Sequence, residues 1–268
     1  MRCYSPSAPV LLTKLRSGRL NGFRWRNGGC PLRLIDSLSL ASSPADLMRT
    51  KRADSMTYHP KKYELANAAH RFLLGRQDGA IVHSLLQAGF LPLSDKRILD
   101  VGCGAGWHLR RLVDLGAASA NCFGIDITAD RLAAARYRNA HMTFLEGSAE
   151  SVPFADDSFD LVTQFVVFSS MPPEVRRATA REMRRVLRPG GAVLWYDMRY
   201  PSPRNANVSR MGRAEIRALF PDCTCRLKGH TLLPPLARLV APRSEMACLM
   251  LEKVPVLRSH YLGMISPH

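Results

Sequence analysis

Three glycines at alternate positions are the first residues in this sequence whose spacing could serve chemistry. Gly102, Gly104 and Gly106 follow the apolar run Ile98–Val101 and precede an amphipathic segment that begins at Trp107. This order predicts a strand, a tight turn and the N-terminus of a helix. Glycine adopts a positive φ at little cost and lets a ligand approach the backbone. Because the first N–H groups of a helix are unpaired and partly positive, the turn suits a carboxylate or a phosphate.

An acidic residue ends the next apolar run. Asp126 closes the segment Asn121–Asp126, 20 residues after Gly106. A carboxylate at the end of a second parallel strand lies at the sheet edge where ligands bind. Its two oxygens can accept hydrogen bonds from both hydroxyls of a ribose. Asp126 therefore predicts a nucleoside ligand without choosing among the cofactors that contain adenosine.

The glycine spacing separates two cofactor classes. A dinucleotide site has the pattern G-x-G-x-x-G, whereas this chain has G-x-G-x-G with Trp107 where the last glycine would stand. A bulky side chain there would block close packing of helix on strand. The run Arg97–Gly106 instead resembles the first motif of class I S-adenosylmethionine-dependent methyltransferases.

Three later segments are similar to this family and occur in its order: Gly147–Phe154, Asp156–Asp160 and Arg188–Gly191. The similarity covers roughly residues 93–200 and continues more loosely to the end of the chain. It implies an α/β fold with a doubly wound, Rossmann-like sheet of seven strands in the order 3-2-1-4-5-7-6. Strand 7 would be antiparallel, and helices would cover both faces.

The resemblance implies S-adenosylmethionine as the cofactor and no metal. The implied cofactor residues are Asp100, Gly102, Cys103, Gly104, Gly106, Asp126, Ile127, Ser148, Ala149, Glu150, Gln164 and Phe165. Asp100 is expected to hold the glycine loop and, through a water, the cofactor's amino group. Ser148 stands where the family commonly has an acid that meets the adenine, so an uncharged contact is expected there.

The implied chemistry is an in-line transfer of a methyl group, for which the enzyme mainly positions the reactants and excludes water. A hydroxyl acceptor would need a base nearby. The candidates for catalysis are His108, just past the glycine turn, and Asp197, at the end of the fifth strand. Tyr196, Arg199 and Tyr200 border the loop after that strand and are the expected substrate contacts.

We therefore expect a methyltransferase that acts, at oxygen, on a small molecule, a saccharide or a lipid-linked acceptor. An RNA or protein methyltransferase is the alternative that net charge favours, although Gln164–Val167 lacks the Asn/Asp-Pro-Pro-Tyr/Phe signature of amino-group methylases. A cofactor-binding pseudoenzyme or regulator is a second alternative, which the changes at Ser148 and Ser169 permit: relatives commonly carry an acid at the first position, and many carry histidine at the second. No stable nucleic-acid partner is expected, since the basic helix at 173–187 has no interleaved aromatic residues for stacking. The oligomeric state is not predicted.

The formal charge of +16 is unevenly distributed. Residues 1–53 hold ten Lys or Arg and two acids, while residues 54–268 hold 28 and 20. Residues 1–55 are predicted to be a basic, disordered extension, with a targeting peptide or an upstream translation start as alternatives. Residues 56–268 are the expected methyltransferase domain, with a cofactor-binding core at 93–200 and a substrate-shaping tail at 200–268.

The seven cysteines form no C-x-x-C pair and indicate reduced thiols in a cytoplasmic protein. No apolar run approaches the roughly 20 residues that a membrane helix needs. Contact with a membrane surface and organelle targeting by residues 1–50 stay open.

The remaining periodicity predicts the elements that position these residues. Helices are expected at 60–91, Ala129–Arg138, 173–187, Arg213–Leu219 and Glu245–Lys253. Strands are expected at Asn121–Asp126, Met142–Glu146, Ala192–Asp197, Thr224–His230 and His260–Ile265, with a proline-broken apolar stretch at Leu232–Val240.

Overall fold

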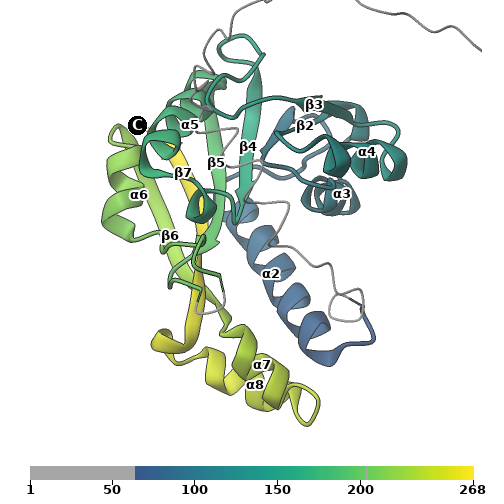
Figure 1. Ribbon diagram of the computed structural model, residues 1–268, viewed down its shortest axis with the longest axis vertical. Coiled ribbons are helices and arrows are strands. Elements are labelled where there is room, and N and C mark those ends of the chain that lie inside the picture. Colours follow the sequence, from purple (N-terminus) through teal and green to yellow (C-terminus); the bar gives the residue numbers. More distant parts are fainter. Residues whose placement is uncertain (1–63, 203–204) are drawn as a thin grey trace, which may run out of the picture. The chain divides into compact units, whose positions relative to one another are not determined.

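The computed structural model describes residues 64–202 and 205–268. The extension predicted for residues 1–55 lies outside the described residues. Helices connect the first five strands, which are parallel, except between the third and the fourth, where turns span residues 147–158. The last two strands, which run antiparallel to each other, then complete the sheet (Figure 1).

The seven strands run in the order β3-β2-β1-β4-β5-β7-β6, and β7 is antiparallel to both of its neighbours. The predicted fold class is thereby confirmed. The strands are β1 (Ile98–Val101), β2 (Cys122–Asp126), β3 (Thr143–Glu146), β4 (Phe159–Phe165), β5 (Leu187–Met198), β6 (Cys223–Leu232) and β7 (Arg258–Pro267).

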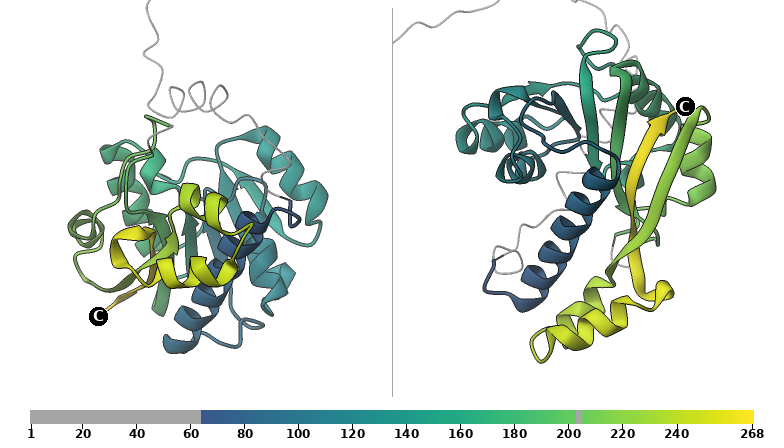
Figure 2. Two further views of the ribbon diagram at one scale, coloured as in Figure 1. Left: turned by 90° about the horizontal axis from the view of Figure 1, so that it is seen from below. Right: turned by 180° about the vertical axis from the view of Figure 1, so that it is seen from behind.

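Helices cover both faces of the sheet (Figure 2). The helices are α2 (Ala68–Gln87), α3 (Trp107–Asp114), α4 (Ala129–Arg138), α5 (Pro173–Arg185), α6 (Arg213–Leu219), α7 (Pro234–Val240) and α8 (Glu245–Glu252), with short 3-10 turns at Ser119–Asn121, Phe168–Ser170 and Pro255–Leu257. Of the helices that the structure describes, none has both the length and the apolar character to cross a bilayer.

Three apolar clusters hold these layers together. One face of the sheet packs against α2, α3 and α4, with Ile81, Leu109 and Leu132 buried there. The opposite face packs against α5 and α6 around Trp195 and Phe220. The first half of α2 contacts α7 and α8 in a third, smaller cluster.

Helix α2 is one continuous helix that includes Gly75 and Gly79, within the helix predicted at 60–91. It ends two residues before Gly89, whose φ is +72°. The stretch expected to be broken by prolines contains α7, because a proline in the first helical turn loses no helical hydrogen bond.

Candidate functional site

The glycine turn between β1 and α3 has the backbone conformation that its sequence predicts. Gly102, Gly104 and Gly106 have φ values of +71°, +53° and +76°. A Cβ added at Gly102 would lie 2.7 Å from both γ-carbons of Val167, and one at Gly106 would lie 3.0 Å from Phe144 Cζ. Conformation and space therefore both require glycine at these two positions.

Asp126 anchors this turn from the end of β2. Its Oδ2 accepts a hydrogen bond from the Gly104 N–H at 2.9 Å, and its Oδ1 accepts one from the Thr128 N–H at 2.9 Å. Each carboxylate oxygen has a further lone pair, so both oxygens can also accept a ribose hydroxyl. The residue seen to hold the glycine loop is thus Asp126, whereas the sequence had assigned that task to Asp100.

Asp100 is buried at the centre of the sheet. Thr163 on β4 donates its hydroxyl proton to Asp100 Oδ1 at 2.8 Å. Burial raises the pKa of Asp100 to about 7; the bond from Thr163 opposes this shift and the charge of Asp126 adds to it. The carboxyl is therefore partly protonated near neutral pH, and its contact with the cofactor stays a prediction.

One small cavity brings together six of the twelve residues predicted to bind the cofactor, and these six come from three different strand ends. They are Gly102, Asp126, Ile127, Ser148, Ala149 and Glu150. Sequence reasoning missed the apolar wall opposite them, formed by Val167, Met171 and Val175. The cavity measures about 40 Å³. Pockets for small molecules start at roughly 300 Å³, so a cofactor needs more space than this arrangement leaves.

The segment after β4 accounts for the small volume. Val167 lies against Gly102, and Val166 has a φ of +57°, which is unusual for a β-branched residue. Gln164 holds this segment, because its Oε1 accepts the Val167 N–H at 3.2 Å and its Nε2 donates to the Tyr196 carbonyl at 3.3 Å. The polar groups of the cavity suit an adenosine cofactor, and Val167 lines the cavity beside Gly102.

Two other predicted residues make local contacts. Ser148 Oγ lies 3.3 Å from Glu150 Oε2 and accepts the Glu150 N–H at 3.2 Å, which closes a turn at the rim of the cavity. Cys103 is buried behind the glycine turn, and burial raises the pKa of its thiol. Cys103 is therefore a packing residue with an unreactive thiol.

His108 lies next to Phe165. Their rings stack with centroids 3.8 Å apart and an interplanar angle of 10°. Among the described residues, nothing hydrogen-bonds to the buried His108 Nδ1. Burial lowers the pKa of His108 to about 4, so the imidazole is neutral at physiological pH. A neutral imidazole with an unpaired nitrogen can accept a proton or a hydrogen bond from a ligand.

Asp197 is buried at the end of β5. It accepts hydrogen bonds from the N–H of Ser169 at 3.2 Å and from the N–H of Met198 at 2.7 Å. Burial raises its pKa to about 6, and hydrogen bonds from Ser169 and Met198 oppose that shift. Asp197 thereby fixes the backbone that follows β4 and β5.

The three predicted substrate residues do not gather at one place. Tyr196 is buried and hydrogen-bonds to Thr231 at 2.9 Å; its ring centroid lies 6.3 Å from that of Phe165. Arg199 donates to the carbonyl of Pro255 at 2.6 Å, and Tyr200 donates to that of Val256 at 3.0 Å. Of the three, only Tyr196 therefore lies near Phe165, the ring on which His108 stacks.

The sequence and the fold were compared with known proteins. Residues 98–191 match the family model described as a methyltransferase domain. A phthiotriol/phenolphthiotriol dimycocerosates methyltransferase of Mycobacterium ulcerans is 38% identical over 113 residues, which cover 42% of this chain and 41% of that protein. The malonyl-[acyl-carrier protein] O-methyltransferase of Erwinia pyrifoliae is 38% identical over 109 residues, covering 39% of this chain and 38% of its own length.

The chain therefore spans about two fifths of the length of these curated relatives. The fold resembles the crystal structure of an S-adenosylmethionine-dependent methyltransferase from Mesorhizobium loti. That likeness has a TM-score of 0.50 at 18% identity and covers 70% of this chain and 99% of the other. The likeness in fold therefore extends beyond residues 98–191, the segment that the family model matches.

Proposed function

Residues 98–191 form a class I methyltransferase domain, and we propose that the protein uses it to transfer a methyl group from S-adenosylmethionine to a small-molecule, saccharide or lipid-linked acceptor. The observation that carries this proposal is the cavity that joins Gly102, Asp126 and Ala149 within the matched segment. These residues come from three strand ends, and each supplies a contact that an adenosine cofactor needs.

When bound, S-adenosylmethionine supplies a methyl group on an already activated sulfonium. Asp126 accepts the ribose hydroxyls through the lone pairs that its backbone contacts leave free. The start of α3 would present its first N–H groups to the carboxylate of the cofactor. The N–H groups of Gly102, Gly104 and Gly106 already donate to Ile125, Asp126 and Cys103 respectively. The backbone at Ala149 and Glu150 meets the adenine. These roles are assigned from the donor and acceptor types at the cavity.

We assign the acceptor side to the row formed by His108, Phe165 and Tyr196. The stacked Phe165 orients the imidazole, and the unpaired His108 Nδ1 can receive the proton of an acceptor hydroxyl. A pKa of about 4 makes this a weak base, so positioning and exclusion of water carry most of the rate enhancement. Asp197 is assigned as a positioning residue, because its side chain is fully buried and holds the backbone N–H groups of Ser169 and Met198.

Two relatives support a lipid or acyl-linked molecule as the acceptor, and one of them supports oxygen as the acceptor atom. One is named for dimycocerosate lipids, and the other is named as an O-methyltransferase of malonyl-acyl carrier protein. Arg199 and Tyr200 are proposed to shape the acceptor mouth by holding the segment at Pro255–Val256, which their side chains bind.

The test uses the full chain, methyl-labelled S-adenosylmethionine and fractionated host extract. Asp126→Ala is the matched inactive control. Label in the lipid or saccharide fraction that disappears with the control supports the proposal. Label in RNA or protein would refute this acceptor class, and cofactor binding without turnover on any fraction would instead favour a regulator.

A further inference from the structure

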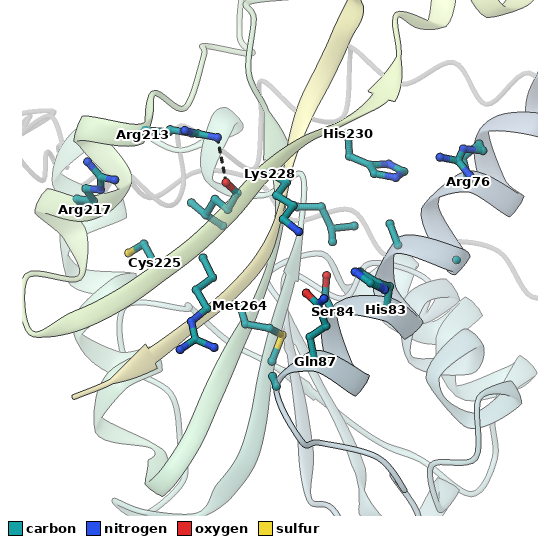
Figure 3. Close-up of a pocket in the computed structure, with 16 residues that line it drawn as sticks. Arg76, His83, Ser84, Gln87, Arg213, Arg217, Cys225, Lys228, His230 and Met264 are labelled. Atoms are coloured by element: carbon teal, nitrogen blue, oxygen red, sulfur yellow. Dashed lines mark hydrogen bonds between the residues drawn. The ribbon is translucent and has the colours of Figure 1, made fainter. Parts of the chain in front are cut away.

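A second, larger cavity lies at the opposite edge of the sheet from β3. It measures about 620 Å³ and opens between α2 and the edge strand β6. Figure 3 shows Lys228 and His230 of β6 pointing toward α2, with Arg213 and Arg217 reaching in from α6. This cavity shares no lining residue with the cavity around Asp126.

The lining of this cavity carries one sign of charge. We name it the basic groove after its five cations: Arg76, Arg213, Arg217, Arg226 and Lys228. None of the sixteen described residues that line it is an aspartate or a glutamate. Its floor includes the apolar side chains of Leu262 and Met264. A low-dielectric wall beside clustered like charges concentrates their field and attracts anions.

Three of these cations have no partner to neutralise them. Arg76 is bonded to Glu252, and Arg213 donates to the Leu227 carbonyl. Within the described part of the chain, the side chains of Arg217, Arg226 and Lys228 make neither an ion pair nor a hydrogen bond. All three are exposed, so an external anion can reach them.

An apolar surface adjoins the basic groove. A neighbouring cavity of about 580 Å³ shares four of its residues, Lys228 among them, and is bounded on its far side by α8. There it is lined by Met246, Leu249 and Met250, which we call the methionine face. Met246 is 63% exposed and Met250 is 53% exposed. Lys253 and Arg258 line the same cavity, so cations flank the apolar side chains.

The exposed apolar residues of the described chain concentrate around this face. Nine large apolar side chains are exposed, and five of them lie between residues 239 and 256. Two of these five, Met246 and Met250, line the cavity beside the basic groove. Exposed apolar side chains gathered at one place mark a binding site. A surface that combines cations with apolar side chains complements an amphiphile that has an anionic head and a hydrocarbon chain.

We propose that the basic groove and the methionine face together dock the protein onto an anionic lipid surface. The groove binds phosphate groups of the lipid heads, and the methionine face lies against the hydrocarbon. Nucleic acid is the less suitable polyanion, because no phenylalanine, tyrosine or tryptophan is among the described residues that line either cavity. This inference is independent of methyl transfer.

The test measures binding of the full chain to vesicles by co-sedimentation. Vesicles of phosphatidylcholine are compared with vesicles that also contain phosphatidylglycerol. The variant Arg226→Ala/Lys228→Ala removes two cations from the groove. Arg177→Ala/Arg181→Ala is the matched control, because it removes two exposed cations from α5 and gives the same net charge.

We expect binding to the anionic vesicles only. The groove variant should bind them about 30-fold more weakly than the wild type, while the α5 control binds as the wild type does. Met246→Ser/Met250→Ser should also weaken binding, since affinity scales with the apolar area that is buried.

Equal loss in both charge variants would overturn the proposal, because net charge alone would then account for binding. The proposal would also be overturned if the protein did not bind anionic vesicles but bound inorganic pyrophosphate or an RNA oligonucleotide through the groove. All six substituted side chains, in the two charge variants and the methionine variant, are exposed. The melting temperatures of these variants should therefore stay close to that of the wild type.

Discussion

Replacement of Asp100 by asparagine should change how stability depends on pH. Asp100 is buried, and its pKa lies near 7 against an ordinary value of 3.8. Between these values the native state keeps a proton that the unfolded state has lost. Raising the pH therefore favours unfolding, with a slope of about 1.4 kcal/mol per pH unit for this group.

The difference of roughly three units corresponds to at most about 4 kcal/mol across the whole window, of which about 2 kcal/mol falls between about pH 5 and pH 7. Asp100→Asn has no proton to lose and keeps an oxygen that can accept from Thr163. The variant should therefore gain about 2 kcal/mol relative to the wild type over that interval. Other titrating groups are common to both proteins and cancel in the comparison.

The assay is urea unfolding of wild type and Asp100→Asn at several pH values in this range. Asp95→Asn is the control, because Asp95 is an exposed residue beside Lys96. Its stability should follow the wild type at every pH. Parallel curves for wild type and Asp100→Asn would refute the reasoning, since they would mean that Asp100 titrates alike in the native and unfolded states.

Three further substitutions test the surroundings of the cofactor cavity. Arg176→Ala should lower the free energy of unfolding by about 3 kcal/mol, because Arg176 is buried and binds Glu215 and two backbone carbonyls; chemical denaturation measures this loss. Gly106→Ala should cost at least about 1–2 kcal/mol for its positive φ, with a further cost from contact with Phe144; thermal melting measures both together. Val167→Ala should lower the free energy of unfolding by about 2 kcal/mol, because a buried side chain is shortened. It should nevertheless raise the affinity for S-adenosylmethionine, which calorimetry measures. Weaker binding would contradict the assignment of Val167 as the residue that fills the cavity.

Local sequence signals predicted much of the fold. The bounds of α4 and α6 agree with the prediction, because each begins and ends at clear changes in periodicity. The strand order is the one implied by the resemblance to class I methyltransferases. Of the predicted residues around the cofactor cavity, Asp126 was found because it closes a strand, where ligands bind in parallel sheets. The others were implied by the resemblance to class I methyltransferases.

Contacts between distant segments could not be predicted. The bond between Thr163 and Asp100 joins residues 63 positions apart and depends on the register of β4 against β1. The basic groove likewise unites Arg76 with Lys228, which belong to elements separated by most of the domain. In the sequence these cations are dispersed among others, so only the packing of α2 beside β6 reveals them as a cluster.

The position of Val167 is a third case. The sequence placed Gln164 and Phe165 at the end of β4 and expected both to face the cofactor. In the structure Gln164 binds backbone atoms, and Val167 is the residue that lies against Gly102. The positive φ of Val166 turns the chain at this point, and no sequence signal for a valine predicts that conformation.

Calorimetric titration of the full chain with S-adenosylmethionine, beside Asp126→Ala, tests the central claim most directly. The wild type should bind the cofactor. The variant should bind about 100-fold more weakly, because it loses two hydrogen bonds to a charged group, and its melting curve checks that the glycine turn still folds. Equal affinity of the two proteins, or no binding by a folded wild type, would contradict the assignment of this cavity as the cofactor site.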